Sequence, residues 1–267
     1  MIEQPMISAG ALAGAAMQIL ISLLLPILFI VYFHKRGGFS WKAAGVGILV
    51  FVVFSQVLEK LLHVYVFSVN PVTAQALGNP WLYALYGGLA AGFFEEFGRY
   101  FGWKLLLRNR LERKDGISLG VGHGGIEAIL IGVIGGVQTI AFALLMQQGK
   151  LEEALGASAP PEAVAQIRGA LVTTPWWEYI AAGLERLPAM LLHIAFSLLV
   201  LIGVRSGKLK YVLYAALLHA AVDFPVALYQ KGMGSLPVLY VYLVLIGAAA
   251  AVIIARSKNW ATFLRKS

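Results

Sequence analysis

The 267-residue chain has no cysteine and few charged residues. The absence of cysteine excludes a disulfide framework, a thiolate metal site and a cysteine nucleophile. Charged residues make up 13% of the chain, whereas a soluble domain carries roughly 25%. Hydrophobic residues make up 60%, and the mean hydropathy is +0.79. This composition excludes both a soluble globular fold and intrinsic disorder.

Long apolar runs predict a polytopic bundle of transmembrane helices. Lipid admits only helices and closed barrels, and we find none of the alternating segments of about ten residues that mark a barrel. About 20 apolar residues suffice for one helix to span a bilayer. We therefore expect a single all-α domain, 1–267, of about seven spans. They lie at residues 6–33, 43–68, 81–104, 117–147, 180–204, 210–230 and 236–255.

The basic residues predict how the bundle is oriented. Four segments carry 15 of the 21 Lys and Arg residues, and they alternate along the chain with segments that carry few. Because positively charged loops stay in the cytoplasm, we expect an external N-terminus and a cytoplasmic C-terminus in a prokaryotic-type plasma membrane. The net charge of +8 is then a topology signal, and we expect a lipid bilayer and no nucleic acid among the partners. The basic segments are residues 35–42, 104–114, 205–210 and 256–266.

One long connection, residues 148–179, is expected on the external side. Its second half has the pattern of a short amphipathic helix that ends in the interfacial Trp176 and Trp177. Both a docked connector and a gate fit this pattern, and we favour the docked connector.

The predicted spans contain many ionisable side chains, which are costly in hydrocarbon and are usually functional or paired. Four of them lie about 9–11 residues from the cytoplasmic end of four different spans, a depth of roughly 13–16 Å. We expect these four to meet in one layer: Glu95, Glu127, His193 and His219. Others in the outer half are interpreted as structural ion pairs or interface groups: Glu59, Lys60, His63, Glu185 and Arg186.

Helical spacing suggests partners for these groups. Arg99 follows Glu95 by four residues, so the two can pair, whereas Glu96 points about 100° away and is left for a different contact. A purely structural buried ion pair is the alternative. His123 precedes Glu127 by four residues on one face, and it is either a metal ligand or a residue at headgroup level.

Two histidines and a carboxylate match a catalytic zinc set with one open position for water, and a further glutamate can act as general base. Asp223 lies one turn after His219 and is a natural orienting partner for a ligand histidine. A serine hydrolase that uses Ser197 and Asp223 is a weaker interpretation, because no serine lies on a strained turn of the kind that presents a nucleophile.

Four motifs in chain order resemble the YhfC family of intramembrane metalloproteases. More distantly, they are similar to PrsW proteases and to the superfamily of CAAX proteases and bacteriocin-processing enzymes. The resemblance covers about residues 81–230, taken as the catalytic core, and implies a helix bundle that opens to the cytoplasm and cleaves peptide bonds in or near the membrane. The motifs are Glu95-Glu96-x-x-Arg99, the segment 122–128 with His123 and Glu127, His193-x-x-x-Ser197, and His219-x-x-x-Asp223.

The resemblance also implies roles for individual residues. Glu95 would be the general base, and His193 and His219 would bind the metal or hold water. Glu127 stands where the CAAX proteases have a histidine, and Asp223 where they have an asparagine. The CAAX pattern has one more residue between the glutamate pair and the arginine, which favours the PrsW-like branch.

Together these observations predict a metal-dependent intramembrane endopeptidase that acts on a membrane protein or a lipidated peptide. We expect a divalent metal, with zinc favoured by the ligand types. A proton-coupled transporter or a non-catalytic scaffold could use the same polar cluster, although no repeat symmetry supports transport. The predicted catalytic residues are Glu95, Glu96, Arg99 and Asp223, and the predicted metal ligands are His123, Glu127, His193 and His219.

Overall fold

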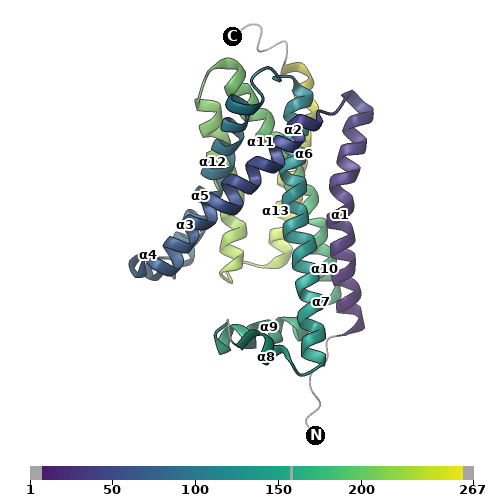
Figure 1. The fold of residues 1–267 in the computed structure, drawn as a ribbon, viewed down its shortest axis with the longest axis vertical. Helices are drawn as coiled ribbons and strands as arrows, with labels where there is room; N and C mark the ends of the chain where they lie inside the picture. The colour runs from purple at the N-terminus through teal and green to yellow at the C-terminus, as the bar shows by residue number, and fades with distance from the viewer. Residues whose placement is uncertain (1–7, 157–158, 261–267) are drawn as a thin grey trace. The chain divides into compact units, whose positions relative to one another are not determined.

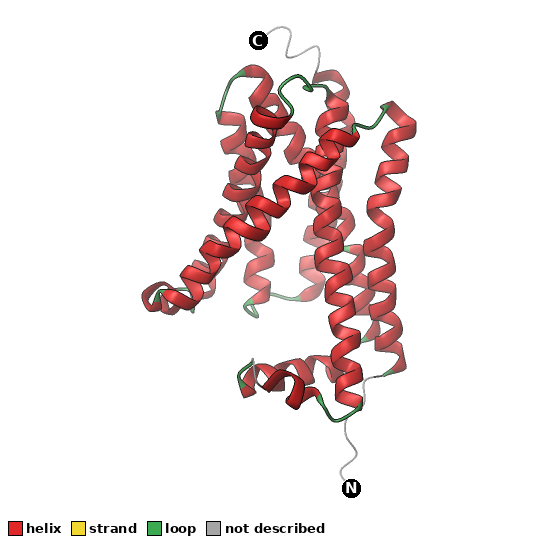
Figure 2. Ribbon diagram, viewed as in Figure 1, coloured by secondary structure: helices red, strands yellow, loops and turns green. Residues whose placement is uncertain are grey.

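The computed structural model describes residues 8–156 and 159–260, and these residues form helices and no strand (Figure 2). The predicted all-α transmembrane bundle is therefore confirmed. Six helices in the described part of the chain are long and apolar enough to cross a membrane, as expected of a multi-pass membrane protein. They are Ala9–Gly37, Trp41–Val69, Arg113–Gln147, Trp176–Ser206, Lys210–Gln230 and Leu236–Asn259.

The remaining predicted span, 81–104, forms helix α5 (Pro80–Phe101), which η3 (Gly102–Leu106) continues. It is not among the six because its charged side chains lower its hydropathy. The count of seven spans and the orientation both stay predictions. Arg265 and Lys266, which contributed to the predicted orientation, lie outside the described residues.

The helices group into two compact units. The described residues of the smaller unit fall within Met1–Ile27 and Glu127–Arg186, and those of the larger unit within Leu28–Ile126 and Leu187–Ser267. The single domain 1–267 and its catalytic core at about 81–230 stay predictions.

The larger unit begins with the second part of α1 (Ala9–Gly37), from Leu28, and continues with one long helical rod (Figure 1). It contains most of the ionisable side chains of interest. Side chains cap the helices that follow a turn: Ser40 accepts a hydrogen bond from the backbone N–H of Ala43, and Asn79 caps α5 ahead of Pro80. The rod comprises α2 (Trp41–Val50), η1 (Phe51–Glu59), α3 (Lys60–Val64) and η2 (Tyr65–Val69). The rest are α4 (Pro71–Ala76), α5, η3, most of α6 (Arg113–Ala128), α11 (Arg186–Ser206), α12 (Lys210–Gln230), α13 (Leu236–Arg256) and η5 (Ser257–Asn259).

Small residues let the helices of this unit approach backbone to backbone. A Cβ on Gly88 of α5 would lie 2.5 Å from the carbonyl oxygen of Ala220 on α12. A Cβ on Gly120 of α6 would lie 2.5 Å from the Cα of Ile194 on α11. Close contacts through small residues are the usual way in which membrane helices associate. They bring α5 against α12 and α6 against α11, so the polar side chains on these helices can meet.

The smaller unit is held by the same kind of contact. Gly14 on α1 (Ala9–Gly37) lies against the backbone of Trp176, where a Cβ would collide with the carbonyl oxygen. Gln18 donates a side-chain hydrogen bond of 3.1 Å to the carbonyl oxygen of Gly132. Besides the first part of α1, the unit contains η4 (Ile129–Val133), α7 (Ile134–Gln147), α8 (Leu151–Gly156), α9 (Pro161–Thr173) and α10 (Trp176–Leu184).

The long connection 148–179 differs from its prediction. The amphipathic helix is present as α9, but it ends at Thr173, and Trp176 begins a new helix, α10, instead of ending the first one. Pro175 explains the break, because a proline disfavours helical backbone in the preceding residue and cannot donate a hydrogen bond. Thr174 accordingly has an extended conformation with ψ of 118°. Residues 157–158 of this connection lie outside the described part of the chain.

Candidate metal centre

Helix α5 contributes two adjacent carboxylates and one guanidinium to a buried cluster in the larger unit. Arg99 donates a hydrogen bond of 3.2 Å from Nη2 to Oε2 of Glu95, as the spacing of four residues predicts. Its other terminal nitrogen, Nη1, donates to Oε1 of Glu96. Arg99 and Glu96 are fully buried, and Glu95 is 6% exposed. One arginine therefore bridges both carboxylates, whereas the spacing alone predicted only its pair with Glu95.

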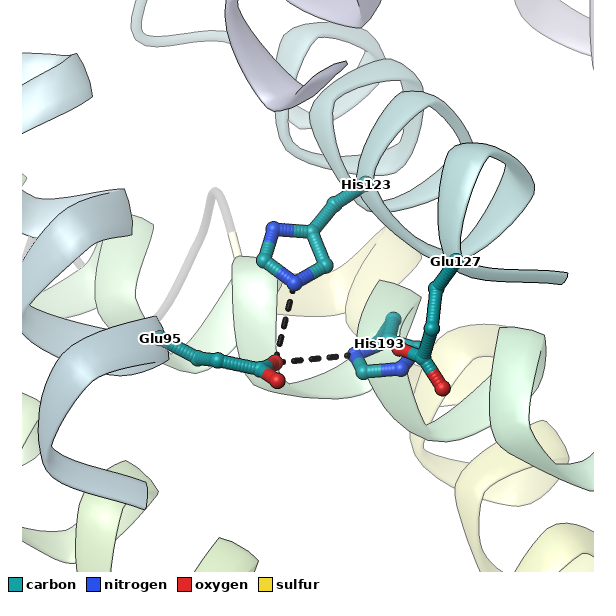
Figure 3. Close-up of side chains that lie close together, drawn as sticks. All are labelled: Glu95, His123, Glu127 and His193. Carbon is teal, nitrogen blue, oxygen red and sulfur yellow. Dashed lines mark hydrogen bonds and ion pairs between the residues drawn. The ribbon is translucent and has the colours of Figure 1, made fainter. Parts of the chain in front are cut away.

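Three imidazoles from three other helices surround the Glu95 carboxylate. Its Oε2 atom lies 2.9 Å from Nε2 of His123 on α6, 3.7 Å from Nδ1 of His193 on α11 and 3.9 Å from Nε2 of His219 on α12. Figure 3 shows the first two of these contacts as dashed lines. Glu95, His193 and His219, three of the four residues predicted to meet, thus lie together in the structure, and their common depth in the bilayer stays a prediction. His123 joins them and is fully buried, and its depth in the bilayer stays a prediction.

The surroundings of His219 differ from those of the other two imidazoles, because a carboxylate lies beside each of its ring nitrogens. Nδ1 lies 2.7 Å from Oε1 of Glu96, and Nε2 lies 3.4 Å from Oδ2 of Asp223 on the next turn of α12. Phe196 of α11 stacks on the ring, with 4.9 Å between the centroids and 13° between the planes. The expected pairing of His219 with Asp223 is therefore present, and Glu96 makes a contact of its own, separate from that of Glu95.

The cluster carries a negative charge that its guanidinium does not balance. Glu95 and Glu96 bring two carboxylates, and Arg99 brings one positive charge, in a site where desolvation makes an uncompensated charge costly. Oε2 of Glu96 is also buried and accepts no hydrogen bond from any described residue. An unsatisfied buried acceptor costs about 1–3 kcal/mol. A protonated imidazole or a bound cation would supply the missing positive charge.

The donor set fits a divalent metal ion. Ligand atoms of Glu95, His123 and His193 lie within 4.8 Å of one another, and so do those of Glu95, Glu96 and His219. Glu95 belongs to both groups, so the candidate positions for an ion adjoin each other at this carboxylate. Imidazole nitrogens and carboxylate oxygens are the ligands that zinc takes in catalytic sites. Arg99 donates to Nδ1 of His193 at 2.7 Å, so an ion on that nitrogen would have to displace the guanidinium.

Two other candidate residues have partners of their own. Glu127 follows His123 by one turn of α6 (Figure 3), but it begins the smaller unit, where Arg186 pairs with it at 3.5 Å. Its role as a ligand stays a prediction. Ser197 is buried and donates its hydroxyl to the carbonyl oxygen of His193 at 2.7 Å, a local helix contact that does not resemble an activated nucleophile.

Most of the residues interpreted as outer structural groups have partners other than the three imidazoles, Glu95 and Glu96. Glu59 accepts a hydrogen bond of 3.0 Å from Ser55 and lies 3.4 Å from His63, whose other ring nitrogen lies 2.8 Å from the Tyr86 hydroxyl. Arg186 pairs with Glu185 at 3.6 Å as well as with Glu127. Lys60 is exposed.

Comparison with known proteins places the chain in a family. The family model described as YhfC intramembrane metalloprotease matches residues 21–245. The chain belongs to this family. The uncharacterized membrane protein YhfC of Bacillus subtilis (strain 168) is 39% identical over 233 residues, which are 87% of this chain and 88% of that protein. No solved structure matches.

The match to the YhfC family confirms the resemblance inferred from the four motifs, and the matched residues 21–245 include all of them. Sequence reasoning missed the aromatic rings that fix the imidazoles. Besides Phe196 on His219, Phe51 of η1 meets His123 edge-on, with 5.0 Å between centroids. No helical spacing links Phe51 to His123, because they lie on helices that are far apart in the sequence, so only the three-dimensional structure reveals this contact.

Proposed function

We propose that this YhfC-family protein is a metal-dependent intramembrane endopeptidase that hydrolyses peptide bonds of a membrane protein or a lipidated peptide. The observation that carries the proposal is the convergence of three imidazoles on one glutamate, which itself touches a buried arginine. The family description and the donor set both support a divalent metal, and zinc is the metal we propose. Cleavage in the cytoplasmic half of the bilayer rests on the predicted orientation.

Glu95 is the proposed general base. It is 6% exposed, while Glu96 has no exposed surface, so Glu95 is the more accessible of the two carboxylates. Its Oε1 atom takes no part in the contacts that hold Oε2, which leaves an acceptor for a proton. When bound, the metal would lower the pKa of a water ligand and polarise the substrate carbonyl.

The chain's own residues then account for the proton transfers. Glu95 removes a proton from water as the water oxygen bonds to the carbonyl carbon of the scissile peptide. The same carboxyl passes this proton to the amide nitrogen as the carbon–nitrogen bond breaks, which releases a carboxylic acid and an amine. Arg99 fixes the orientation of Glu95 through its hydrogen bond of 3.2 Å.

His219 is held between two acids, Glu96 and Asp223, which fix the orientation of its ring and raise its basicity as a ligand. Asp223 is thus proposed as a positioning residue. His123 and His193 are proposed as the other imidazole ligands, and Glu127 stays a further candidate one turn from His123.

The substitution Glu95→Gln tests this proposal, because it keeps the shape and most hydrogen bonds of the side chain but removes the base. We expect peptide hydrolysis to fall by at least about 100-fold, the usual contribution of general base catalysis. The assay uses purified protein in liposomes with a mixture of synthetic transmembrane-segment peptides, and mass spectrometry detects the cleavage products.

Glu59→Gln is the matched control, because Glu59 is also a buried membrane carboxylate beside a histidine but lies outside the cluster. This variant should cleave as the unmodified protein does. Equal cleavage by the Glu95→Gln variant would remove Glu95 as the base and leave packing as the role of the cluster.

A further inference from the structure

A cavity of about 190 Å³ lies in the larger unit where α6 begins and where α11 and α13 end. Its cationic end is separate from the imidazole cluster, because Arg113 in its wall precedes His123 by ten residues of α6, or about 15 Å of helix. On α11, Arg205 in the wall follows His193 by twelve residues, or about 18 Å. The cavity therefore lies at the basic end of the helices that carry the cluster.

The cavity has a surplus of positive charge. Arg113, Arg205 and Lys258 line it together with one carboxylate, Glu112. Glu112 is already paired with Lys114 at 2.9 Å. None of the three cationic side chains forms an ion pair with a described residue, so the positive charge at the cavity has no acidic partner within 8–156 and 159–260.

Arg113 is held firmly in the cavity wall. Its Nε donates a hydrogen bond of 2.6 Å to the hydroxyl of Ser257, and its Nη2 donates one of 2.8 Å to the carbonyl oxygen of Ile254. Nη1 takes part in neither bond. The guanidinium is therefore fixed before any ligand arrives, and one of its terminal nitrogens remains for a further acceptor. A fixed guanidinium is a favourable partner for phosphate oxygens.

The rest of the wall is apolar and follows one side of α11. Leu198, Leu201 and Ile202 line it, and Trp260 lies at the same site. Tryptophan is enriched at the boundary between hydrocarbon and headgroups. A site with cations beside an apolar helix surface matches a molecule with an anionic head and a hydrocarbon chain. A free phosphate ion would use the cations but would have no need of the apolar wall.

We propose that this cavity binds an anionic phospholipid of the phosphatidylglycerol class. The phosphate contacts Arg113, Arg205 and Lys258, and an acyl chain lies along the half-buried Ile202 of α11 and Trp260. Basic pockets between membrane helices are suited to anionic headgroups, and each Lys or Arg adds to the attraction. The proposal does not depend on the proposed hydrolysis, because neither the cavity nor its cations include a residue of the imidazole cluster.

The test compares two double variants of the full chain that lose the same charge at the same end of the bundle. Arg205→Gln with Lys258→Gln removes two cations from the cavity and leaves Arg113 and its structural hydrogen bonds intact. Lys208→Gln with Lys210→Gln removes two exposed cations that do not line it. Purified protein in detergent is titrated with dioleoylphosphatidylglycerol or dioleoylphosphatidylcholine, and native mass spectrometry counts the retained lipids.

We expect the unmodified protein to retain the glycerol lipid in preference to the choline lipid. The cavity variant should bind the glycerol lipid roughly 10- to 30-fold more weakly, and the control variant less than about twofold more weakly. Ile202→Trp, which fills the apolar wall without changing charge, should also reduce retention. Circular dichroism spectra and melting temperatures check that the variants are folded.

Three results would overturn the proposal. Equal retention of the two lipids would show that the cavity does not select an anionic headgroup. Equal losses in the two double variants would assign binding to diffuse surface charge. Displacement of the lipid by millimolar inorganic phosphate would identify a site for the free ion, in which the apolar wall has no role.

Discussion

The Arg99 guanidinium touches three ionisable groups of the cluster: Glu95, Glu96 and His193. It balances one of the two carboxylates, and the remaining negative charge must be met by a proton on an imidazole or by a bound cation. Removing one partner of a buried charge pair typically costs about 3–5 kcal/mol, so these charges cannot be varied independently. The metal content of the purified protein decides which cation is present.

The first prediction therefore concerns metal retained by the imidazoles. The double variant His193→Ala with His219→Ala should lose most of the metal that copurifies with the unmodified protein, because it removes nitrogens on both sides of Glu95. Elemental analysis of protein purified without chelator measures the ratio of metal to chain. His63→Ala is the matched control, since His63 lies beside a buried glutamate, Glu59, outside the cluster and should not alter that ratio.

An unchanged ratio in the double variant would contradict the assignment of these histidines as ligands. It would also leave a protonated imidazole as the source of the missing positive charge. The structure would then support a relay or packing role for the same side chains.

At the scale of residues, spacing within one helix predicted contacts that the structure contains. The pairs of Glu95 with Arg99 and of His219 with Asp223 follow from a separation of four residues, which places side chains on one face. The second contact of Arg99, with Glu96, and its third, with His193, did not follow. The third depends on how α11 packs against α5, which a linear pattern does not specify.

At the scale of elements, the contact between α5 and α12 sets the distance between the glutamates and His219. Gly88 and Gly92 lie against the carbonyl oxygens of Ala220 and Ala216, one turn apart on each helix. The next residue after Ala216 on the same face, Ala220, adjoins His219 in the sequence. Any residue that pushes these helices apart should therefore disturb the site as well as the fold.

The second prediction tests this contact with two neighbouring glycines. Gly88→Ala places a Cβ 2.5 Å from the carbonyl oxygen of Ala220, whereas nothing lies within 4 Å of a Cβ at Gly87. Gly88→Ala should lower the free energy of unfolding by about 1–3 kcal/mol, the usual cost of overpacking. Gly87→Ala should raise it slightly, by about 0.5–1 kcal/mol, because alanine favours the helix.

Melting temperatures of the two purified variants in detergent measure the difference. The Gly88 variant should melt several degrees lower than the unmodified protein and should retain less metal. Equal melting temperatures for the Gly88 and Gly87 variants would show that the helices can separate there without cost, and that the close contact does not hold the site together.

Sequence patterns predicted the spans well and the breaks poorly. The prediction 210–230 matches α12, and 236–255 differs from α13 by one residue, because uninterrupted apolar runs define both ends. The break at Pro175 was missed because the amphipathic pattern continues past it. The hydrophobic pattern also does not predict the π-helical segments η1 to η4, because one extra residue in a turn leaves the composition unchanged.

At the scale of the whole molecule, the topology depends on whether α5 crosses the membrane. If α5 crosses, the basic segments 35–42 and 104–114 lie on the same side, as the positive-inside rule requires. If it does not cross, the two segments lie on opposite sides, and the site residues Glu95, Glu96 and Arg99 would lie on a helix that enters without spanning. Helix α5 is not among the six helices that qualify by hydropathy, so the two arrangements are distinguished by the side of the membrane on which residues 104–114 lie.

The third prediction uses the absence of cysteine in the chain. Single cysteines at the exposed positions Lys35, Asn109 and Gln148 give three otherwise identical proteins, each with one reactive thiol. In intact cells, a membrane-impermeant maleimide should label Gln148→Cys, and it should label Lys35→Cys and Asn109→Cys only after the membrane is opened. Labelling of Asn109→Cys but not Lys35→Cys in intact cells would mean that α5 does not cross. Since α5 carries the proposed base, that result would move the site from the hydrocarbon interior to a re-entrant helix, where water reaches Glu95 from the opposite side.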